Sequence, residues 1–241
     1  LSDWSSDVCS SDLGEAAITL LTVQNSMTVA RVETLDPDLV TQQISAVIED
    51  IPPHAAKTGA LGNAAIVGAV AARAREFKFP LVVDPVMISK HGAALIDAPA
   101  REALVGELLP HAALVTPNLP EAAALAAIVV RTVEHMKEAA RRIHGLTGAK
   151  VLVKGGHLEG AALDILYDGA AFHEYVCERF DTPHTHGTGC TYSAAITACL
   201  ALGMALPDAV GRAKRYVTGA IRTNPGLGSG RGPVNHHAEV V

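Results

Sequence analysis

Short apolar runs alternate with longer stretches of helical periodicity along this chain from Gly14 onward. The runs are rich in Val, Ile and Leu, as expected of buried parallel strands. They lie at 16–23, 81–83, 112–115, 150–153 and 162–167, with a further extended segment at 171–180. Helical periodicity covers 37–50, 62–76, 98–109, 119–127, 133–147, 189–202 and 207–222, and Asp36-Pro37 is a typical helix start. This alternation predicts an α/β fold, in which helices cover both faces of a mostly parallel sheet.

Size and composition narrow the classes of protein that fit this pattern. The chain has 241 residues, of which 49% are hydrophobic, so residues 14–241 are expected to form a single domain. Its net charge of −6 is spread along the sequence, which makes nucleic acid an unexpected partner. The apolar run 122–130 is too short to span a membrane. The four cysteines show no C-x-x-C spacing, which favours a reducing cytoplasm.

Residues 1–13 differ from the rest of the chain, because Ser and Asp fill most positions and the dipeptide Ser-Asp recurs. The segment has neither a basic start nor a long apolar core, so it does not fit a signal peptide. It is predicted to be a non-native or disordered segment.

Polar motifs follow the predicted strands at the edge where ligands bind in open parallel sheets. Asp84 follows 81–83, Asn118 and Glu121 follow 112–115, and Lys154 follows 150–153. Taken singly, each is better explained as a turn former, a helix-start residue or a solvated lysine. Together they supply the carboxylates, carboxamide and lysine that phosphoryl transfer with Mg²⁺ requires, so the joint interpretation is preferred.

The segment from His186 to Thr191 places a glycine-flanked turn and a lone thiol where a long helix begins. Backbone N–H groups at a helix start bind phosphate oxygens, and Gly187 and Gly189 let the backbone approach an anion closely. Cys190 would lie in the first turn, where the helix favours the thiolate. The alternative is a plain helix entry with an inert cysteine, and this motif alone does not separate the two.

Seven motifs together resemble one family. They are Thr22-Val23-Gln24-Asn25, Lys57-Thr58-Gly59, Asp84-Pro85-Val86-Met87, Thr116-Pro117-Asn118-Leu119-Pro120-Glu121, Val153-Lys154-Gly155-Gly156-His157, His186-Gly187-Thr188-Gly189-Cys190-Thr191 and Gly232-Pro233-Val234-Asn235-His236. In these motifs the chain is similar to the hydroxymethylpyrimidine/phosphomethylpyrimidine kinases of thiamine biosynthesis. The resemblance implies a ribokinase-like, three-layer α/β/α fold. It also implies two ATP-dependent steps, from the hydroxymethylpyrimidine to its monophosphate and then to the diphosphate.

The resemblance also implies roles for individual residues. Cys190 falls on the catalytic position, beside an anion hole formed by Gly187, Thr188 and Gly189. Lys154, Asn118 and Thr188 would contact ATP. Asp84 and Glu121 would hold Mg²⁺, with Asn118 helping to organise its waters. Gln24, Ala60 and Val86 would line the site of the small pyrimidine substrate, and a homodimer is the assembly considered.

The sequence departs from the family pattern at two places. Ala60 stands where the family usually has Met, which predicts a looser pocket. Residues 1–13 contain nothing of the family's first strand and Gly-Ser-Asp loop, so the chain is expected to lack part of the substrate site.

Three other functions remain open. The nearest is a pyridoxal or pyridoxine kinase on the same fold. A second is a non-catalytic pyrimidine-binding protein, against which the retention of Lys154, Glu121 and Cys190 argues. The last is a cysteine hydrolase, for which the sequence shows no ordered His and Asn or Asp partners.

Overall fold

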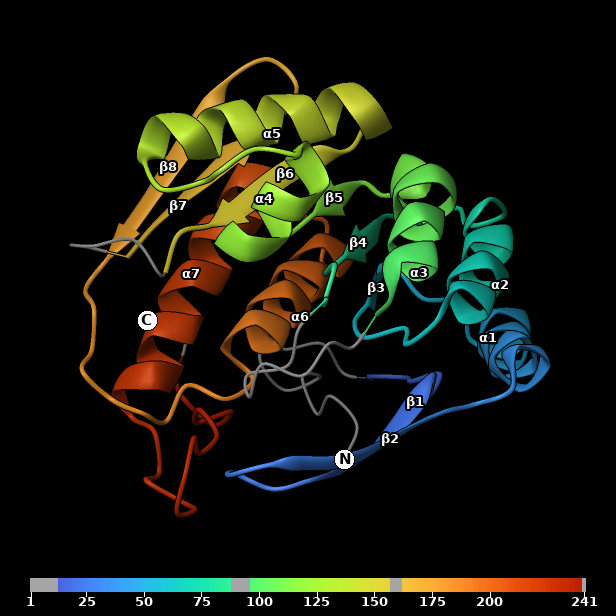
Figure 1. The fold of residues 1–241 in the computed structure, drawn as a ribbon, viewed down its shortest axis with the longest axis horizontal. Helices are drawn as coiled ribbons and strands as arrows, with labels where there is room; N and C mark the ends of the chain where they lie inside the picture. Colours follow the sequence, from blue (N-terminus) through green and yellow to red (C-terminus); the bar gives the residue numbers. More distant parts are fainter. Residues whose placement is uncertain (1–12, 88–95, 157–161, 240–241) are drawn as a thin grey trace.

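The computed structural model describes residues 13–87, 96–156 and 162–239, which fold into a three-layer α/β/α arrangement (Figure 1). The strands are β1 (Leu20–Gln24), β2 (Val29–Thr34), β3 (Ala56–Thr58), β4 (Leu81–Val83), β5 (Leu114–Val115), β6 (Lys150–Lys154), β7 (Ala162–Tyr167) and β8 (Phe172–Cys177). The helices are α1 (Pro37–Asp50), α2 (Ala64–Ala74), α3 (Ala98–Ala103), η2 (Leu104–Leu108), η3 (Leu109–His111), α4 (Leu119–Ala126), α5 (Val133–Thr147), α6 (Thr188–Ala201) and α7 (Leu206–Arg222). The predicted fold class is confirmed.

The central sheet has six strands in the order β3-β4-β5-β6-β7-β8. Strands β3 to β6 pair in parallel, whereas β7 and β8 add antiparallel pairs at one side. The prediction that 162–167 is a parallel strand is therefore wrong in direction. Strand β7 begins at Ala162, soon after β6 ends at Lys154, and so short a separation favours an antiparallel pair, because a parallel partner needs a long crossover.

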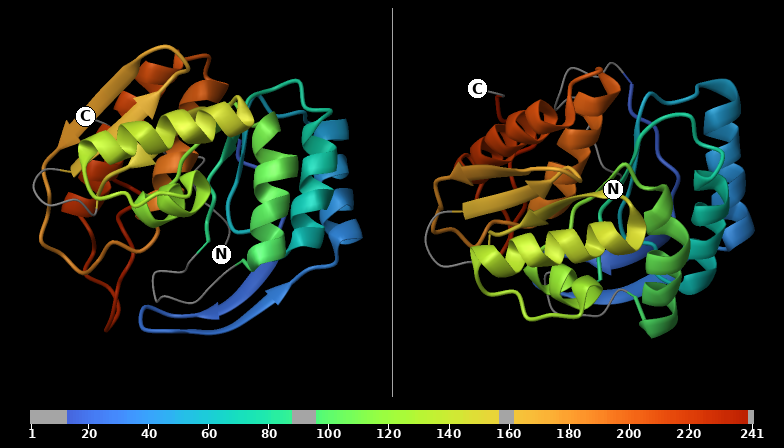
Figure 2. Two further views of the ribbon diagram at one scale, coloured as in Figure 1. Left: turned by 45° about the horizontal axis from the view of Figure 1, so that its top comes forward. Right: turned by 90° about the horizontal axis from the view of Figure 1, so that it is seen from above.

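Two hydrophobic clusters lie on opposite faces of this sheet. The turned ribbon views in Figure 2 show the helices that cover these two faces. Alternate residues of each strand point to opposite faces. Leu81, Val83 and Val115 belong to the cluster beneath α2, α4 and α5. Val82 and Leu114 belong to the cluster beneath α6 and α7. Helices cover both faces, so these strands are buried on both sides and read as continuous apolar runs.

Most helices begin and end where the sequence predicts. Asp36 caps α1, and its carboxylate accepts hydrogen bonds from the N–H groups of Asp38 and Leu39. The predicted helix 98–109 divides into α3, the π-helix η2 and the short 3₁₀-helix η3. Pro99 lies in the first turn, where proline is tolerated, and a single Gly106 does not specify a π-helix, so periodicity alone does not reveal this change in helical pitch.

The first predicted strand is the main departure from the expected fold. Residues 20–24 form β1, which pairs only with the antiparallel β2 in a separate two-stranded sheet. Figure 1 shows this hairpin set apart from the central sheet. Leu21 and Val23 are 53% and 61% exposed, so the prediction of a buried parallel strand is wrong. The segment is apolar, but none of the described helices covers Leu21 and Val23. Strands β2 and β3 were not predicted.

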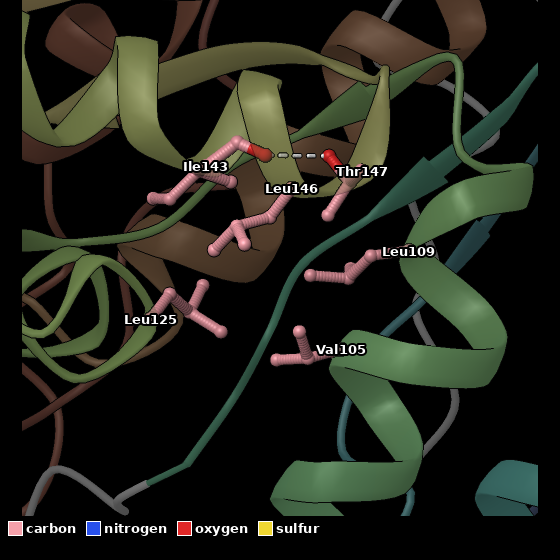
Figure 3. A pocket seen from close by; sticks show the side chains of 6 residues that line it. All are labelled: Val105, Leu109, Leu125, Ile143, Leu146 and Thr147. Atoms are coloured by element: carbon pink, nitrogen blue, oxygen red, sulfur yellow. Dashed lines mark hydrogen bonds between the residues drawn. The ribbon is translucent and has the colours of Figure 1, made fainter.

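A shallow apolar pocket lies between η2, η3, α4 and α5 (Figure 3). It is lined by Val105, Leu109, Leu125, Ile143, Leu146 and Thr147. The Thr147 hydroxyl already donates to the carbonyl oxygen of Ile143 at 2.8 Å. With no free polar group directed into it, this pocket is a packing gap between helices and not a ligand site.

Within the described ranges, no helix has both the length and the apolar character needed to cross a membrane. Residues 1–12 lie outside those ranges, so the interpretation of 1–13 as a non-native or disordered segment stays a prediction.

Candidate functional site

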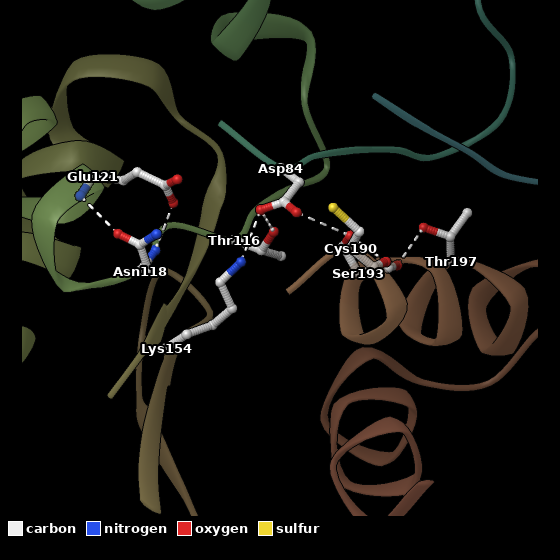
Figure 4. A network of polar contacts seen from close by, with 8 residues as sticks. All are labelled: Asp84, Thr116, Asn118, Glu121, Lys154, Cys190, Ser193 and Thr197. Atoms are coloured by element: carbon white, nitrogen blue, oxygen red, sulfur yellow. Dashed lines mark hydrogen bonds and ion pairs between the residues drawn. The ribbon is translucent and has the colours of Figure 1, made fainter. Parts of the chain in front are cut away.

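The parallel strands deliver polar side chains to one edge of the sheet, where Asp84 is at the centre of a buried network (Figure 4). Asp84 follows β4 and is 2% exposed. Its Oδ1 accepts hydrogen bonds from Lys154 Nζ at 2.8 Å and from Thr116 Oγ1 at 3.0 Å. Its Oδ2 accepts one from Ser193 Oγ at 3.3 Å. The predicted grouping of Asp84 with Lys154 is therefore present, and the carboxylate joins β4, β5, β6 and α6.

Lys154 ends β6 and is the cation of this network. Burial lowers the pKa of its ammonium group, but the charges of Asp84 and Glu121 and the hydrogen bond to Asp84 outweigh burial, so the pKa is raised. A Cβ placed on Gly189 would lie 3.2 Å from Lys154 Nζ. The lysine is thus charged and lies against the glycine turn, and it is not a solvated surface residue.

Asn118 and Glu121 form a reciprocal cap at the start of α4. The Asn118 side chain accepts from the Glu121 N–H at 2.9 Å, and Glu121 Oε2 accepts from the Asn118 N–H at 2.8 Å. Burial raises the pKa of Glu121 to about 7, with the charge of Lys154 lowering it and the charge of Asp84 raising it. Glu121 therefore does cap the start of α4, as the helix-start explanation predicts. A capping role alone, however, would not require this acid to be buried near a second carboxylate.

Helix α6 begins at Thr188 without a side-chain cap. Gly187 precedes it with φ of 82°, a left-handed conformation that favours glycine. The Thr188 hydroxyl donates to the Thr185 carbonyl oxygen at 2.8 Å, so it stabilises the turn and is not aimed outward. Cys190 is half-buried in the first turn and lies near Asp84 and Ser193 in Figure 4. This start has the geometry of an anion-binding helix terminus.

The C-terminal motif 232–236 supports the same turn. The His186 N–H donates to the Gly232 carbonyl oxygen at 3.0 Å, and the Val234 N–H donates to the His186 carbonyl oxygen at 3.3 Å. The His236 Nε2 lies 3.1 Å from Thr191 Oγ1. A segment about 45 residues further along the chain therefore fixes the entry to α6.

The three predicted substrate residues lie apart from one another along the chain. Gln24 is exposed at the end of β1, and its side chain contacts Thr22 Oγ1 at 3.5 Å. Ala60 is half-buried, and its carbonyl oxygen accepts from Thr19 Oγ1 at 2.8 Å. Val86 is half-buried and lies two residues after Asp84. Among the described contacts none joins these side chains to the Asp84 network, so their roles stay predictions.

Sequence reasoning missed Ser193 as a member of the network. Ser193 is fully buried, and its Oγ also lies 3.0 Å from the Cys190 carbonyl oxygen, so its single hydroxyl proton is shared between this oxygen and Asp84 Oδ2. Its position three residues after Cys190 places both on one face of a helix. This three-residue spacing from Cys190 is the sequence signal that could have identified Ser193.

The two carboxylates have the chemistry of a magnesium site. In the described ranges no group of three or more His, Cys, Asp or Glu side chains could hold a metal ion by itself. Magnesium typically takes one or two protein carboxylates and completes its shell with water and phosphate oxygens. The charge of Asp84 raises the pKa of Glu121, and a dication beside them would relieve this repulsion. Asp84 and Glu121 therefore fit such an ion.

The arrangement brings a cation, an uncapped helix start, a thiol and two acidic groups to one sheet edge. The cation and the helix start attract an anion with several oxygens. The thiol in the same turn can act as a base toward a bound alcohol.

Comparison with known proteins agrees with this chemistry. A family described as phosphomethylpyrimidine kinase matches residues 11–235. The thiamine biosynthesis bifunctional protein ThiED of Geobacter sulfurreducens is 48% identical over 225 residues, which cover 92% of this chain but 46% of that protein. The hydroxymethylpyrimidine/phosphomethylpyrimidine kinase of Synechococcus elongatus is 43% identical, over 92% of this chain and 86% of that protein.

A solved structure is similar over most of the fold. The ADP complex of Bacillus subtilis pyridoxal kinase aligns with a TM-score of 0.86 and 37% identity, covering 93% of this chain and 86% of that one. The similarity confirms the ribokinase-like architecture expected from the sequence.

Proposed function

The chain belongs to the phosphomethylpyrimidine kinase family, a family of phosphotransferases, and from this membership and the site geometry we propose its reaction. It transfers the γ-phosphate of ATP to 4-amino-5-hydroxymethyl-2-methylpyrimidine and then phosphorylates the monophosphate to the diphosphate. These two steps supply the pyrimidine half of thiamine.

The observation that carries this proposal is the position of Lys154. Its ammonium group is paired with the buried Asp84 at 2.8 Å and lies against Gly189 at the uncapped start of α6. A charged lysine and a helix start that face the same space form a phosphate-binding arrangement. A merely structural ion pair would not need the glycine turn beside it.

Individual residues have distinct roles in phosphate binding and in proton transfer. The backbone N–H groups of Gly187, Thr188, Gly189 and Cys190 surround the transferred phosphate, and Lys154 neutralises its charge. Cys190 accepts the proton of the substrate alcohol as the bond to phosphorus forms. Since the transferring group is largely metaphosphate-like, this proton leaves late, and a thiolate is a sufficient base.

Asp84 and Glu121 would hold Mg²⁺, which when bound would supply positive charge against the phosphates. Asn118 orients the Glu121 carboxylate through the cap. Lys154 pairs with Asp84 at 2.8 Å and so places the Asp84 carboxylate at the same edge of the sheet as Glu121.

Phosphorus NMR of the purified chain with ATP, MgCl₂ and the hydroxymethylpyrimidine tests the proposal. The expected result is ADP formed together with a pyrimidine monophosphate, followed by the diphosphate. The Cys190→Ala variant serves as the control, because it retains the backbone groups of the turn. Release of inorganic phosphate without a pyrimidine product contradicts the proposal, and so does a lack of ATP binding.

Pyridoxal phosphorylation is the second candidate, favoured by the similarity to the Bacillus subtilis pyridoxal kinase. The small side chain of Ala60 leaves room for a substituted ring. The same assay with pyridoxal in place of the pyrimidine separates the two activities. A higher kcat/KM for pyridoxal would assign the chain to that substrate.

A homodimer formed through the β1–β2 hairpin is the proposed assembly. Leu21, Val23 and Met27 are 53%, 61% and 60% exposed on it, and a second copy would cover this apolar surface. Sedimentation of the parent and of a Val23→Asp variant tests the dimer.

A cytoplasmic location is proposed from the cysteine spacing.

A further inference from the structure

A second buried ion pair lies between β7 and α7, behind the phosphate site. Lys214 Nζ donates to Asp164 Oδ2 at 2.6 Å, and the two side chains are 8% and 4% exposed. A buried pair of this kind adds little net stability compared with apolar residues of the same volume. Stability alone therefore does not account for its position in the core.

The other oxygen of Asp164 holds the backbone directly after Lys154. Asp164 Oδ1 accepts a hydrogen bond from the Gly155 N–H at 2.9 Å. Asp164 is also the cross-strand partner of Lys154 in the antiparallel β6–β7 pair. The carboxylate thus fixes the point at which the chain leaves β6.

Close packing confines Gly155 on its remaining side. A Cβ at this position would overlap the carbonyl oxygen of Leu163 and lie 2.8 Å from the Met136 Cε. The backbone cannot shift toward β7 and is tied to Asp164, so Lys154 starts from a fixed position.

Lys214 connects the same pair to α6. Its ammonium nitrogen lies 5.9 Å from the centre of the Tyr192 ring, which is within range of a cation–π interaction. Tyr192 is buried two residues after Cys190. Burial, with the charge of Asp164, raises the pKa of the Tyr192 hydroxyl well above its ordinary value, so the ring stays neutral. The pair therefore touches both elements that carry the phosphate-binding groups.

We propose that Asp164 and Lys214 are positioning residues for phosphoryl transfer: Asp164 fixes Lys154 through the Gly155 amide, and Lys214 neutralises Asp164 and orients it. This inference rests on the proposed role of Lys154 in binding ATP phosphate. On this proposal Asp164 and Lys214 act through the backbone and α6, with no direct contact to substrate or nucleotide.

Two double variants separate positioning from stability. Asp164→Asn with Lys214→Met removes both charges but keeps an acceptor for the Gly155 N–H. Asp164→Val with Lys214→Met removes the charges and the acceptor together. The Tyr175→Phe variant is the control for α7 docking, because it deletes only the hydroxyl that donates to the Pro207 carbonyl oxygen at 3.0 Å.

Steady-state kinetics and titration with Mg·ADP are the main measurements. The Asn double variant is expected to keep a KM for ATP within about threefold of the parent, since the anchor remains. The Val double variant is expected to raise the KM for ATP and the Kd for Mg·ADP by about tenfold, because Lys154 loses its fixed starting point. Equal KM and Kd values in the two folded double variants would overturn the proposal.

Hydrogen exchange of the Gly155 amide, measured in the parent protein, tests the anchor without relying on enzyme activity or on the folding of a variant. In the parent without nucleotide this amide is expected to be protected to the same degree as the interior of β6. Exchange at the rate of an open loop would overturn the proposal. Normal protection with no pyrimidine phosphorylation would instead disprove the proposed function and leave the anchor in place.

Discussion

The end of the central sheet and the β1–β2 hairpin both carry predicted site residues, but they are built differently. Around Asp84 the polar side chains are buried or half-buried, and the contacts join residues up to 109 positions apart. In the hairpin, Leu21, Val23 and Gln24 are exposed. Only a few hydrogen bonds hold it, such as that from the Arg231 N–H to the Ser26 carbonyl oxygen at 2.8 Å. The proposed phosphate side of the site is thus pre-organised, whereas the proposed substrate side depends on a thin, exposed hairpin.

Replacing Lys154 by Met should break the buried network most severely. It leaves the Asp84 carboxylate buried without its cation, and removal of one partner of a buried pair costs about 3–5 kcal/mol of unfolding free energy. Urea unfolding measures the loss. Adding Asp84→Asn should restore most of the stability but no activity, because both phosphate and metal contacts are then gone. If Lys154→Met alone has the same unfolding free energy as the parent, the network is not rigid.

Cys190→Ala should leave stability nearly unchanged but slow phosphoryl transfer by about 10²–10⁴-fold, the usual effect of losing a general base. Binding of Mg·ADP, followed by calorimetry, should persist because the backbone of the turn is intact. Cys177→Ala, on the edge strand β8, is the matched control and should keep the parent rate. Turnover of Cys190→Ala within a few-fold of the parent would remove the thiol from the reaction.

Glu121→Gln tests the charge in the network while keeping the cap, since Gln can also accept the Asn118 N–H. Burial raises the pKa of Glu121 from 4.5 to about 7, so the folded protein binds this proton more tightly than the unfolded chain. The resulting stability is complete below pH 4.5 and is lost as the pH rises through 7, by up to about 3 kcal/mol.

The parent should therefore lose stability relative to Glu121→Gln between pH 4.5 and 7.5, in EDTA, as measured by urea unfolding at each pH. In kinetic assays the variant should need more Mg²⁺. If the free energy of unfolding changes with pH in the same way in both proteins, the Glu121 carboxyl is hydrated in solution.

Gly230→Ala addresses the hairpin and should have the smallest effect on global stability. A Cβ there would overlap the Ser26 carbonyl oxygen, so the hairpin tip must move. Unfolding free energy should change by less than about 1 kcal/mol, because little apolar area is buried. Amide exchange across 20–34 should accelerate, and the KM for the pyrimidine should rise more than that for ATP.

Gly145→Ala is the control for that experiment, because a Cβ at this helical position meets nothing within 4 Å. If Gly230→Ala raises both KM values equally, the two halves of the site are not separable in the way that the comparison implies.

The central sheet was predictable from sequence because burial on both faces leaves a continuous apolar run, as in 81–83 and 150–153. The polar residues after these runs were predictable as a group, because parallel strands end at a common edge. The hairpin was not predictable, because Leu21 and Val23 have the apolar side chains typical of a core but are exposed in the described structure.

The contacts of the site needed the three-dimensional structure. Asp84, Lys154 and Ser193 are far apart in sequence, and spacing does not reveal which side chains meet. The π-helix η2 and the Asp164–Lys214 pair were equally hidden, because neither has a local sequence signal.

The long separations within the Asp84 network also have a consequence for folding during synthesis. Asp84 leaves the ribosome 70 residues before Lys154 and 109 before Ser193. At about 5–20 residues per second, its carboxylate waits several seconds for these partners. Until α6 arrives, β4 can close its pairing with β3 but cannot bury Asp84 at low cost, because a lone charge resists leaving water. We therefore expect β4 and its neighbours to dock late, after α6 has been made, with α7 then completing the helix layer on that face of the sheet.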